Sequence, residues 1–154
     1  MKAFRFTLEA VRTLRLRQEN DALEQYARTL AVRQRAINAL EAVREKINAH
    51  WAEMRRRLAA GGAASEARRL QEYQNVLETR QQECAAGLRA AERGVNLASQ
   101  AMLLARQQRE VVDAYRDKQV TRHQRLENRE EQKISDEFAA RRSTSLQFAT
   151  PTHA

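Results

Sequence analysis

Cysteine, proline and aromatic residues are scarce in this sequence of 154 residues, and glycine is little more common. There is one cysteine, Cys84, with one proline and four glycines, and aromatic residues make up 5% of the chain. A lone cysteine excludes an internal disulfide, so we expect Cys84 to be a small buried side chain in a reducing compartment. With so few breaks and so few large rings, the composition favours long helices over a compact core.

The sequence also lacks the features of a membrane span, a secretory signal and a catalytic site. No apolar run approaches the roughly eighteen residues that a membrane helix needs, and the start, Met1 to Phe6, has no apolar signal core. We therefore expect a cytoplasmic protein with no direct membrane insertion. His50, His123 and His153 are too scattered to share a metal, and no phosphate loop or nucleophile elbow is present. The prediction is no enzyme, no cofactor and no metal.

What the sequence does have is a heptad repeat of mostly apolar residues on both sides of Gly61-Gly62. Before the glycines, one row is Leu16, Leu23, Leu30, Ile37, Arg44, Trp51 and Leu58, and a second is Tyr26, Arg33, Leu40, Ile47 and Met54. After them, one row is Leu70, Leu77, Cys84, Ala91, Ala98, Ala105, Val112, Gln119 and Leu126, with Leu88, Val95 and Met102 beside it. A 3.5-residue spacing sustained over so many heptads predicts helices wound around each other.

The fold class that follows is all-α, a long two-helix antiparallel coiled-coil hairpin with a longer second helix. We expect a single hairpin over residues 1–142, with helix one over about 7–58, a turn over 59–65, helix two over about 66–140, and a disordered tail over 143–154. Thr7 and Ser65 are the predicted N-caps, because their hydroxyls can accept hydrogen bonds from free amides. A glycine in the left-handed conformation is expected to end helix one.

A short turn makes facing residue numbers sum to about 124, which places the start of the chain opposite about residue 123. The last part of helix two then extends beyond its partner as a lone helix. Such a helix is marginal in water, so it either frays or is ordered by a partner that surrounds it.

Positive charge is concentrated on the first helix. The net charge is +8, and residues 1–58 hold 13 Lys and Arg against 7 Asp and Glu. This excess admits a basic coiled-coil arm that binds nucleic acid, although no aromatic stacking platform accompanies it. A coiled coil lying on an anionic membrane surface is a third reading, but its apolar stripe is already used by the partner helix.

Two end motifs carry a resemblance to a known family. The start, Phe4-Arg5-Phe6 followed by Leu8, Val11, Leu14 and Arg15, and the stretch from Glu127 to Phe138, resemble the two ends of the flagellar FliJ proteins. The resemblance covers residues 2 to about 142. It implies a non-catalytic stalk and chaperone-escort component of the flagellar type III protein export apparatus, peripheral to the inner membrane at the flagellar base. The equivalent stalk protein of a virulence injectisome is the alternative that shares this architecture.

The resemblance also implies partners and two sets of contact residues. The partners are the hexameric export ATPase, the cytoplasmic domain of the export gate membrane protein, and export chaperones, without nucleic acid. The ATPase ring is expected to bind Phe4, Phe6, Arg12, Arg15, Arg129, Lys133, Asp136 and Phe138. The gate and chaperones are expected to bind nearer the hairpin, at Ile47, Trp51, Met54, Tyr73 and Val76.

Overall fold

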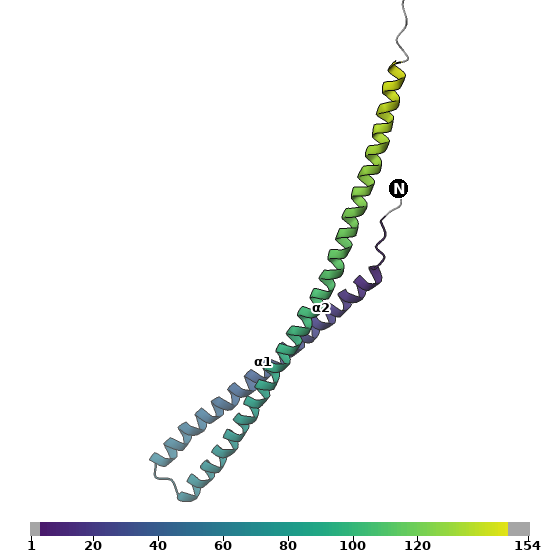
Figure 1. Cartoon of the computed structure of the whole chain (residues 1–154). Helices are drawn as coiled ribbons and strands as arrows, with labels where there is room; N and C mark the ends of the chain where they lie inside the picture. The colour runs from purple at the N-terminus through teal and green to yellow at the C-terminus, as the bar shows by residue number, and fades with distance from the viewer. Residues whose placement is uncertain (1–3, 148–154) are drawn as a thin grey trace, which may run out of the picture. The chain divides into compact units, whose positions relative to one another are not determined.

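The computed structural model describes residues 4–147, with side chains described as far as Arg142, and it consists of two long helices joined by a short turn (Figure 1). Helix α1 spans Glu9–Ala59 and helix α2 spans Ala64–Gln147, and residues 4–147 contain no strand. The all-α fold of two helices packed against each other, with the second one longer, is confirmed.

The helices form two units. One contains the residues up to Leu16 together with those from Gln107 onward, and the other contains Arg17–Arg106. In the first unit Arg12 contacts Asp113, and in the second His50 contacts Leu70 and Tyr73, so the two helices run antiparallel within each unit. The facing residue numbers in both units sum to about 124, as the turn length predicts.

The turn between the helices is built on Gly61, which has a positive φ of 78°. The amide of Gly61 donates to the carbonyl of Leu58, and the amide of Gly62 donates to the carbonyl of Arg57, at 3.2 Å each. This pair of hydrogen bonds is the Schellman motif, in which a left-handed glycine satisfies the last carbonyls of a helix. The predicted helix end at the two glycines is therefore confirmed.

Both predicted N-caps are wrong by one or two residues. The carbonyl of Leu8 accepts the amide of Arg12, so α1 begins at Glu9 and Thr7 precedes the cap position. Likewise the carbonyl of Ala63 accepts the amides of Glu66 and Ala67, which places Ser65 inside α2. Thr7 lies one residue before the first cap position, and Ser65 lies two residues after the second.

The predicted end of helix two was also too early. Helix α2 continues to Gln147, so residues 143–147, which were assigned to a disordered tail, are helical. Serine and threonine have lower helix propensity but do not break a helix as proline does, and the proline lies further on at Pro151. The rest of the predicted tail, residues 148–154, lies outside the described part of the chain.

The row of α2 that faces α1 is the predicted one. Its members from Leu70 to Gln119 are buried or half-buried, while the last member, Leu126, is exposed. The row of α1 that contains Leu40 and Met54 is also buried or half-buried as predicted.

The other predicted row of α1 is correct only in its middle, where Leu30 and Ile37 are half-buried, and elsewhere the contact falls one residue earlier. Val43 and His50 are buried, whereas Arg44 and Trp51, which follow them in the sequence, are exposed. The contact row is therefore Arg15, Ala22, Thr29, Ala36, Val43 and His50. The prediction followed the larger apolar residues Leu16 and Leu23, yet both rows satisfy the alternation of three and four residues equally well. Ala22, Thr29 and Ala36 of the contact row are small and half-buried, whereas Leu16 and Leu23 are exposed.

The core of the second unit contains polar groups near the turn. Gln74 is the most buried residue, at 2% exposure, and its side-chain amide donates to Glu78 at 2.8 Å. His50 is also buried, with Nε2 2.9 Å from the carbonyl oxygen of Leu70 and its ring edge-on to Tyr73. These contacts satisfy the side-chain amide of Gln74 and one ring nitrogen of His50, whereas the side-chain oxygen of Gln74 is buried without a hydrogen-bond partner.

Ion pairs between charged side chains lie next to the turn, and one of them joins the two helices. Glu53 pairs with both Arg56 and Arg57, and Arg57 reaches across to Glu66 at 3.2 Å. The hydrogen bond from Arg57 is the main reason that the pKa of Glu53 lies below its ordinary value.

Candidate functional site

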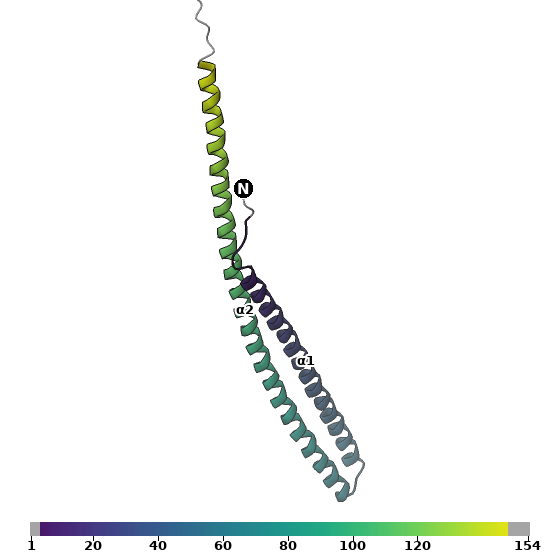
Figure 2. The ribbon, with the colours of Figure 1, turned by 90° about the vertical axis from the view of Figure 1, so that its right-hand side faces the viewer.

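The candidate site lies in the first unit, where the start of the chain meets α2 (Figure 2). Before α1 begins, Phe4 packs edge-on against His123 with ring centroids 5.6 Å apart, and Phe6 packs against Tyr115 at 6.3 Å. Aromatic contacts of this kind add to the burial of the rings themselves. They attach the extended first residues to the side of α2.

An ion-pair cluster attaches the first turn of α1 to the same helix. The Nε of Arg12 donates to Asp113 at 2.7 Å, and Arg109 reaches the second oxygen of that carboxylate at 2.5 Å. The hydrogen bond from Arg12 is the largest cause that lowers the pKa of Asp113, and the same pairing raises the pKa of Arg12. Asp113 therefore stays ionised and holds two cations together across the helix pair.

Arg15 completes this set of contacts by donating to the side-chain oxygen of Gln108 at 2.7 Å. Four of the residues predicted to bind an ATPase ring lie at the start of the chain, and all four contact α2 and are half-buried: Phe4, Phe6, Arg12 and Arg15. Their contacts within the molecule fix the start of the chain against α2. Whether they also contact a partner stays a prediction.

Beyond these contacts α2 continues as an exposed segment, which we call the extension and define as residues 128–142. Every side chain in the extension is exposed. The four predicted ring-binding residues of helix two, Arg129, Lys133, Asp136 and Phe138, all lie in it. The predicted lone helix at the end of helix two is therefore present in the structure.

The extension has two different faces. Arg129, Lys133 and Asp136 follow one another at spacings of four and three residues, so they share a face of the helix. Ile134 and Phe138, four residues apart, lie on the opposite side and are 54% and 66% exposed. A charged face and an exposed apolar pair on one lone helix form a surface suited to a partner that encloses it.

Sequence reasoning missed several residues of this site. Asp113, Tyr115 and His123 are not members of the predicted rows, so only the three-dimensional contacts identify them. Ile134 had a signal in the sequence, since it lies four residues before Phe138. The prediction listed Phe138 with the charged residues and did not separate the two faces.

The predicted gate and chaperone residues lie in the second unit, near the turn. Trp51, Tyr73 and Val76 are exposed, Ile47 is half-buried, and Met54 is buried. Met54 and Ile47 belong to the contact row of α1, which explains why they pack inward. The exposed members of this set are therefore Trp51, Tyr73 and Val76.

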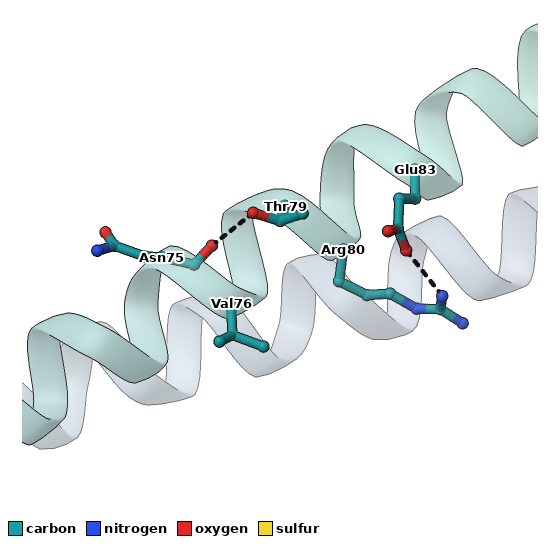
Figure 3. A pocket seen from close by; sticks show the side chains of 5 residues that line it. All are labelled: Asn75, Val76, Thr79, Arg80 and Glu83. Carbon is teal, nitrogen blue, oxygen red and sulfur yellow. Dashed lines mark hydrogen bonds and ion pairs between the residues drawn. The ribbon is translucent and has the colours of Figure 1, made fainter.

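Val76 also lines a shallow hollow on the surface of α2 (Figure 3). The other residues around it are Asn75, Thr79, Arg80 and Glu83. The hydroxyl of Thr79 donates to the backbone carbonyl of Asn75 at 2.9 Å, and Arg80 pairs with Glu83 at 2.9 Å. All five residues come from one helix, so the hollow offers a groove on a helix surface and no enclosed pocket for a small molecule.

Several arginines of α1 have acidic partners. Arg12 pairs with Asp113, Arg28 with Glu24, and Arg57 with both Glu53 and Glu66. These pairs offset part of the positive charge that motivated the nucleic-acid reading. Among residues 4–147, no group of His, Cys, Asp and Glu is arranged to hold a metal ion, and neither described helix has an apolar stretch long enough to cross a membrane.

The fold and the site together define a class of protein, an α-helical hairpin whose second helix carries an exposed extension. The sequence profile of the family described as "Flagellar FliJ protein" matches residues 4–145. The chain belongs to the FliJ family and is, at the family level, a protein related to flagellar export. No curated protein and no solved structure matches the chain.

Proposed function

We propose that this chain is the stalk of the flagellar export ATPase, and that the extension at residues 128–142 enters the ATPase ring and promotes its assembly and activity. The observation that carries the proposal is the exposure of every side chain in the extension, on a helix held in place by the contacts of Phe4, Phe6 and Arg12. An isolated helix of this length is only marginally stable in water, because its own backbone hydrogen bonds add little net stability. A protein channel can supply both apolar and charged contacts to such an exposed helix.

The same proposal assigns the exposed residues near the turn to the export gate and to chaperones. Trp51, Tyr73 and Val76 are large, apolar and exposed, and they belong to the unit that does not contain the extension. Exposed aromatic side chains are common anchors in protein interfaces. In this arrangement the unit that carries the extension engages the ATPase and the unit that contains the turn engages the gate, at the cytoplasmic face of the inner membrane.

The test measures ATP hydrolysis by the export ATPase of the same organism, with and without this chain, followed by size-exclusion chromatography. We expect faster turnover and a shift to ring-sized species with the intact chain. A chain that lacks residues 128–154 should lose both effects, as should the double variant Ile134→Ala with Phe138→Ala. The proposal fails if the intact chain neither binds nor stimulates the ATPase.

A double comparison separates the two surfaces. Tyr73→Ala with Val76→Ala should leave ATPase stimulation unchanged and weaken binding to the gate's cytoplasmic domain and to empty chaperones. The double variant Ile134→Ala with Phe138→Ala should lose ATPase stimulation and leave binding to the gate's cytoplasmic domain and to empty chaperones unchanged. If both variants impair both activities equally, the assignment of separate surfaces is wrong even where ATPase binding holds.

A further inference from the structure

Helix α2 carries a second heptad pattern beside the rows that face α1, and six of its eight positions are exposed while Gly94 and Gln108 are half-buried. One row of this second pattern is Ala90, Leu97, Leu104 and Val111. The other is Gly94, Ala101, Gln108 and Tyr115. Together the eight positions alternate in steps of four and three residues, which is the spacing of a coiled-coil contact. Because α2 is one uninterrupted helix, this spacing follows from the helix itself.

Charged residues are absent from all eight positions, in a chain of which 31% is charged. When the same two rows are continued along α2, they contain charged residues at Glu83 before the pattern and at Lys118 and Arg122 after it. Each position of the second pattern lies one residue before a position of the α2 rows that face α1. On α1, the residues one before the contact positions Ala22 and Thr29 are Asp21 and Arg28, which are charged. The uncharged face is therefore particular to this part of α2.

The large apolar members of the pattern are exposed to solvent. Leu97 is 68% exposed, Leu104 56% and Val111 70%. A row of exposed apolar side chains at heptad spacing is typical of a helix that packs against another helix.

The pattern is complementary to itself in the antiparallel direction. When Ala101 of one α2 faces Leu104 of another, Gly94 faces Val111 and Ala90 faces Tyr115. Each of these pairs joins a small side chain to a large one, which fills the space between two helices without voids. Leu97 faces Gln108, whose side-chain oxygen accepts a hydrogen bond from Arg15, and Tyr115 also packs against Phe6 of its own chain.

The charges at both ends of the pattern fit the same alignment. In that register Glu83 of one copy faces Arg122 of the other, and two-fold symmetry repeats this pair at the opposite end. A parallel arrangement would instead place Glu83 against Glu83 and Leu104 against Leu104. Charge pairs at the flanks of a coiled coil select its orientation in this way.

We propose that the second heptad pattern of α2 is a homodimer interface, in which α2 pairs antiparallel with α2 of a second copy of this chain. The proposal concerns a surface other than the extension and the turn, and it stands or falls independently of ATPase binding. Its occupant is a second copy because the rows match themselves in size and in charge.

The first test measures the mass of the intact chain in solution by analytical ultracentrifugation over a range of concentrations. We expect a dimer that dissociates on dilution. Leu104→Glu buries two charges near the two-fold axis, so it should weaken the dimer at least about tenfold. The matched control is Leu103→Glu, because Leu103 is the neighbouring residue, is 49% exposed, and lies outside both rows. Far-UV circular dichroism checks that both variants remain helical.

The second test addresses orientation, in a background with Cys84→Ser. A mixture of the Ala101→Cys chain with the Leu104→Cys chain should crosslink on mild oxidation, and each variant alone should crosslink poorly. Glu83→Arg should weaken the dimer, and adding Arg122→Glu to the same chain should restore it.

Four outcomes overturn the proposal. They are a chain that is monomeric at every concentration, equal effects of Leu103→Glu and Leu104→Glu, crosslinking of single variants as fast as of the mixture, and failure of the charge exchange to restore the dimer. A monomer that binds a helix of another protein through Leu104 would assign the same face to a different occupant and would also reject the homodimer.

Discussion

Asp113 forms two ion pairs in the first unit, and the one with Arg12 links α1 to α2. Its two carboxylate oxygens accept from Arg12 and Arg109, so one side chain joins the first turn of α1 to α2. Ion pairs that retain solvent contact are individually weak. In a unit whose described side chains include none that is fully buried, these pairs act together with the aromatic contacts of Phe4 and Phe6 to hold the start of the chain.

We expect Asp113→Asn to loosen the start of α1. The variant removes the charge that holds two arginines, so opening of residues 9–16 should become easier by about 0.5–1 kcal/mol. Hydrogen exchange at neutral pH should show amides in that segment exchanging about two- to fivefold faster. Asp117→Asn removes the same charge from an exposed position of the same helix, and it should leave the segment unchanged. Equal acceleration by both variants would contradict the role of Asp113.

The same carboxyl predicts a pH dependence. The pKa of Asp113 is lowered in the folded chain below its ordinary 3.8, chiefly by the hydrogen bond from Arg12. A group whose pKa falls on folding stabilises the fold above its unfolded pKa, and this stabilisation is lost as the pH falls through the folded value. The attachment should therefore persist through neutral and mildly acidic pH and weaken only below about pH 4. A carboxyl NMR titration checks this, and Arg12→Gln should raise the pKa of Asp113; an unchanged pKa in that variant would remove Arg12 as the cause.

At the scale of the elements, the end of α1 is determined by the backbone of one residue. Gly61 has φ of 78°, a conformation that costs an L-residue about 1–2 kcal/mol. An added Cβ would meet nothing within 4 Å, so space is not the constraint at this position. Gly87 also has open space around its Cβ position, but it lies within a regular helix.

These two glycines should respond to alanine with opposite signs. We expect Gly61→Ala to lower the free energy of unfolding by about 1 kcal/mol, because the left-handed turn no longer suits the residue. Gly87→Ala should raise it by about 0.5–1 kcal/mol, because alanine loses less conformational entropy in a helix. Urea unfolding followed by circular dichroism measures both. Destabilisation by Gly87→Ala as well would show that the glycine has a contact outside this chain.

The elements were largely predictable from the sequence, and the errors have identifiable physical causes. The two helices, the turn at Gly61 and the contact rows of α2 follow from periodicity and from glycine chemistry. Val43 and His50 could not be preferred over Arg44 and Trp51, because a 3–4 alternation fits two neighbouring registers of α1. The contacts of Asp113 and His123 depend on which side chains meet across the pair, which periodicity does not specify. Ile134 and Phe138, by contrast, could be recognised from their spacing alone.

At the scale of the whole molecule, the buried apolar core is unevenly distributed. The buried apolar residues among those described are Leu40, Val43, Met54, Leu77 and Val95, and all five belong to the unit formed by Arg17–Arg106. The other unit is held by aromatic contacts and ion pairs at its half-buried residues. Since buried apolar area is the main stabilising contribution, the two units should differ in stability.

Hydrogen exchange of the free chain should therefore show a gradient of protection. We expect the slowest amides around Leu40–Met54 and Leu77–Val95, faster exchange in residues 9–16 and 107–127, and the fastest in the extension at 128–142, where no side chain is buried. Binding of the ATPase ring should slow exchange in the extension by at least about tenfold, because a marginal helix becomes ordered when a partner supplies its contacts. The truncated chain that lacks residues 128–154 should retain the slow amides of the Arg17–Arg106 unit, which shows that the extension serves the partner and not the fold. Uniform protection along α2 in the free chain would mean that the extension is already stable, and the proposed ordering by the ring would then have no physical basis.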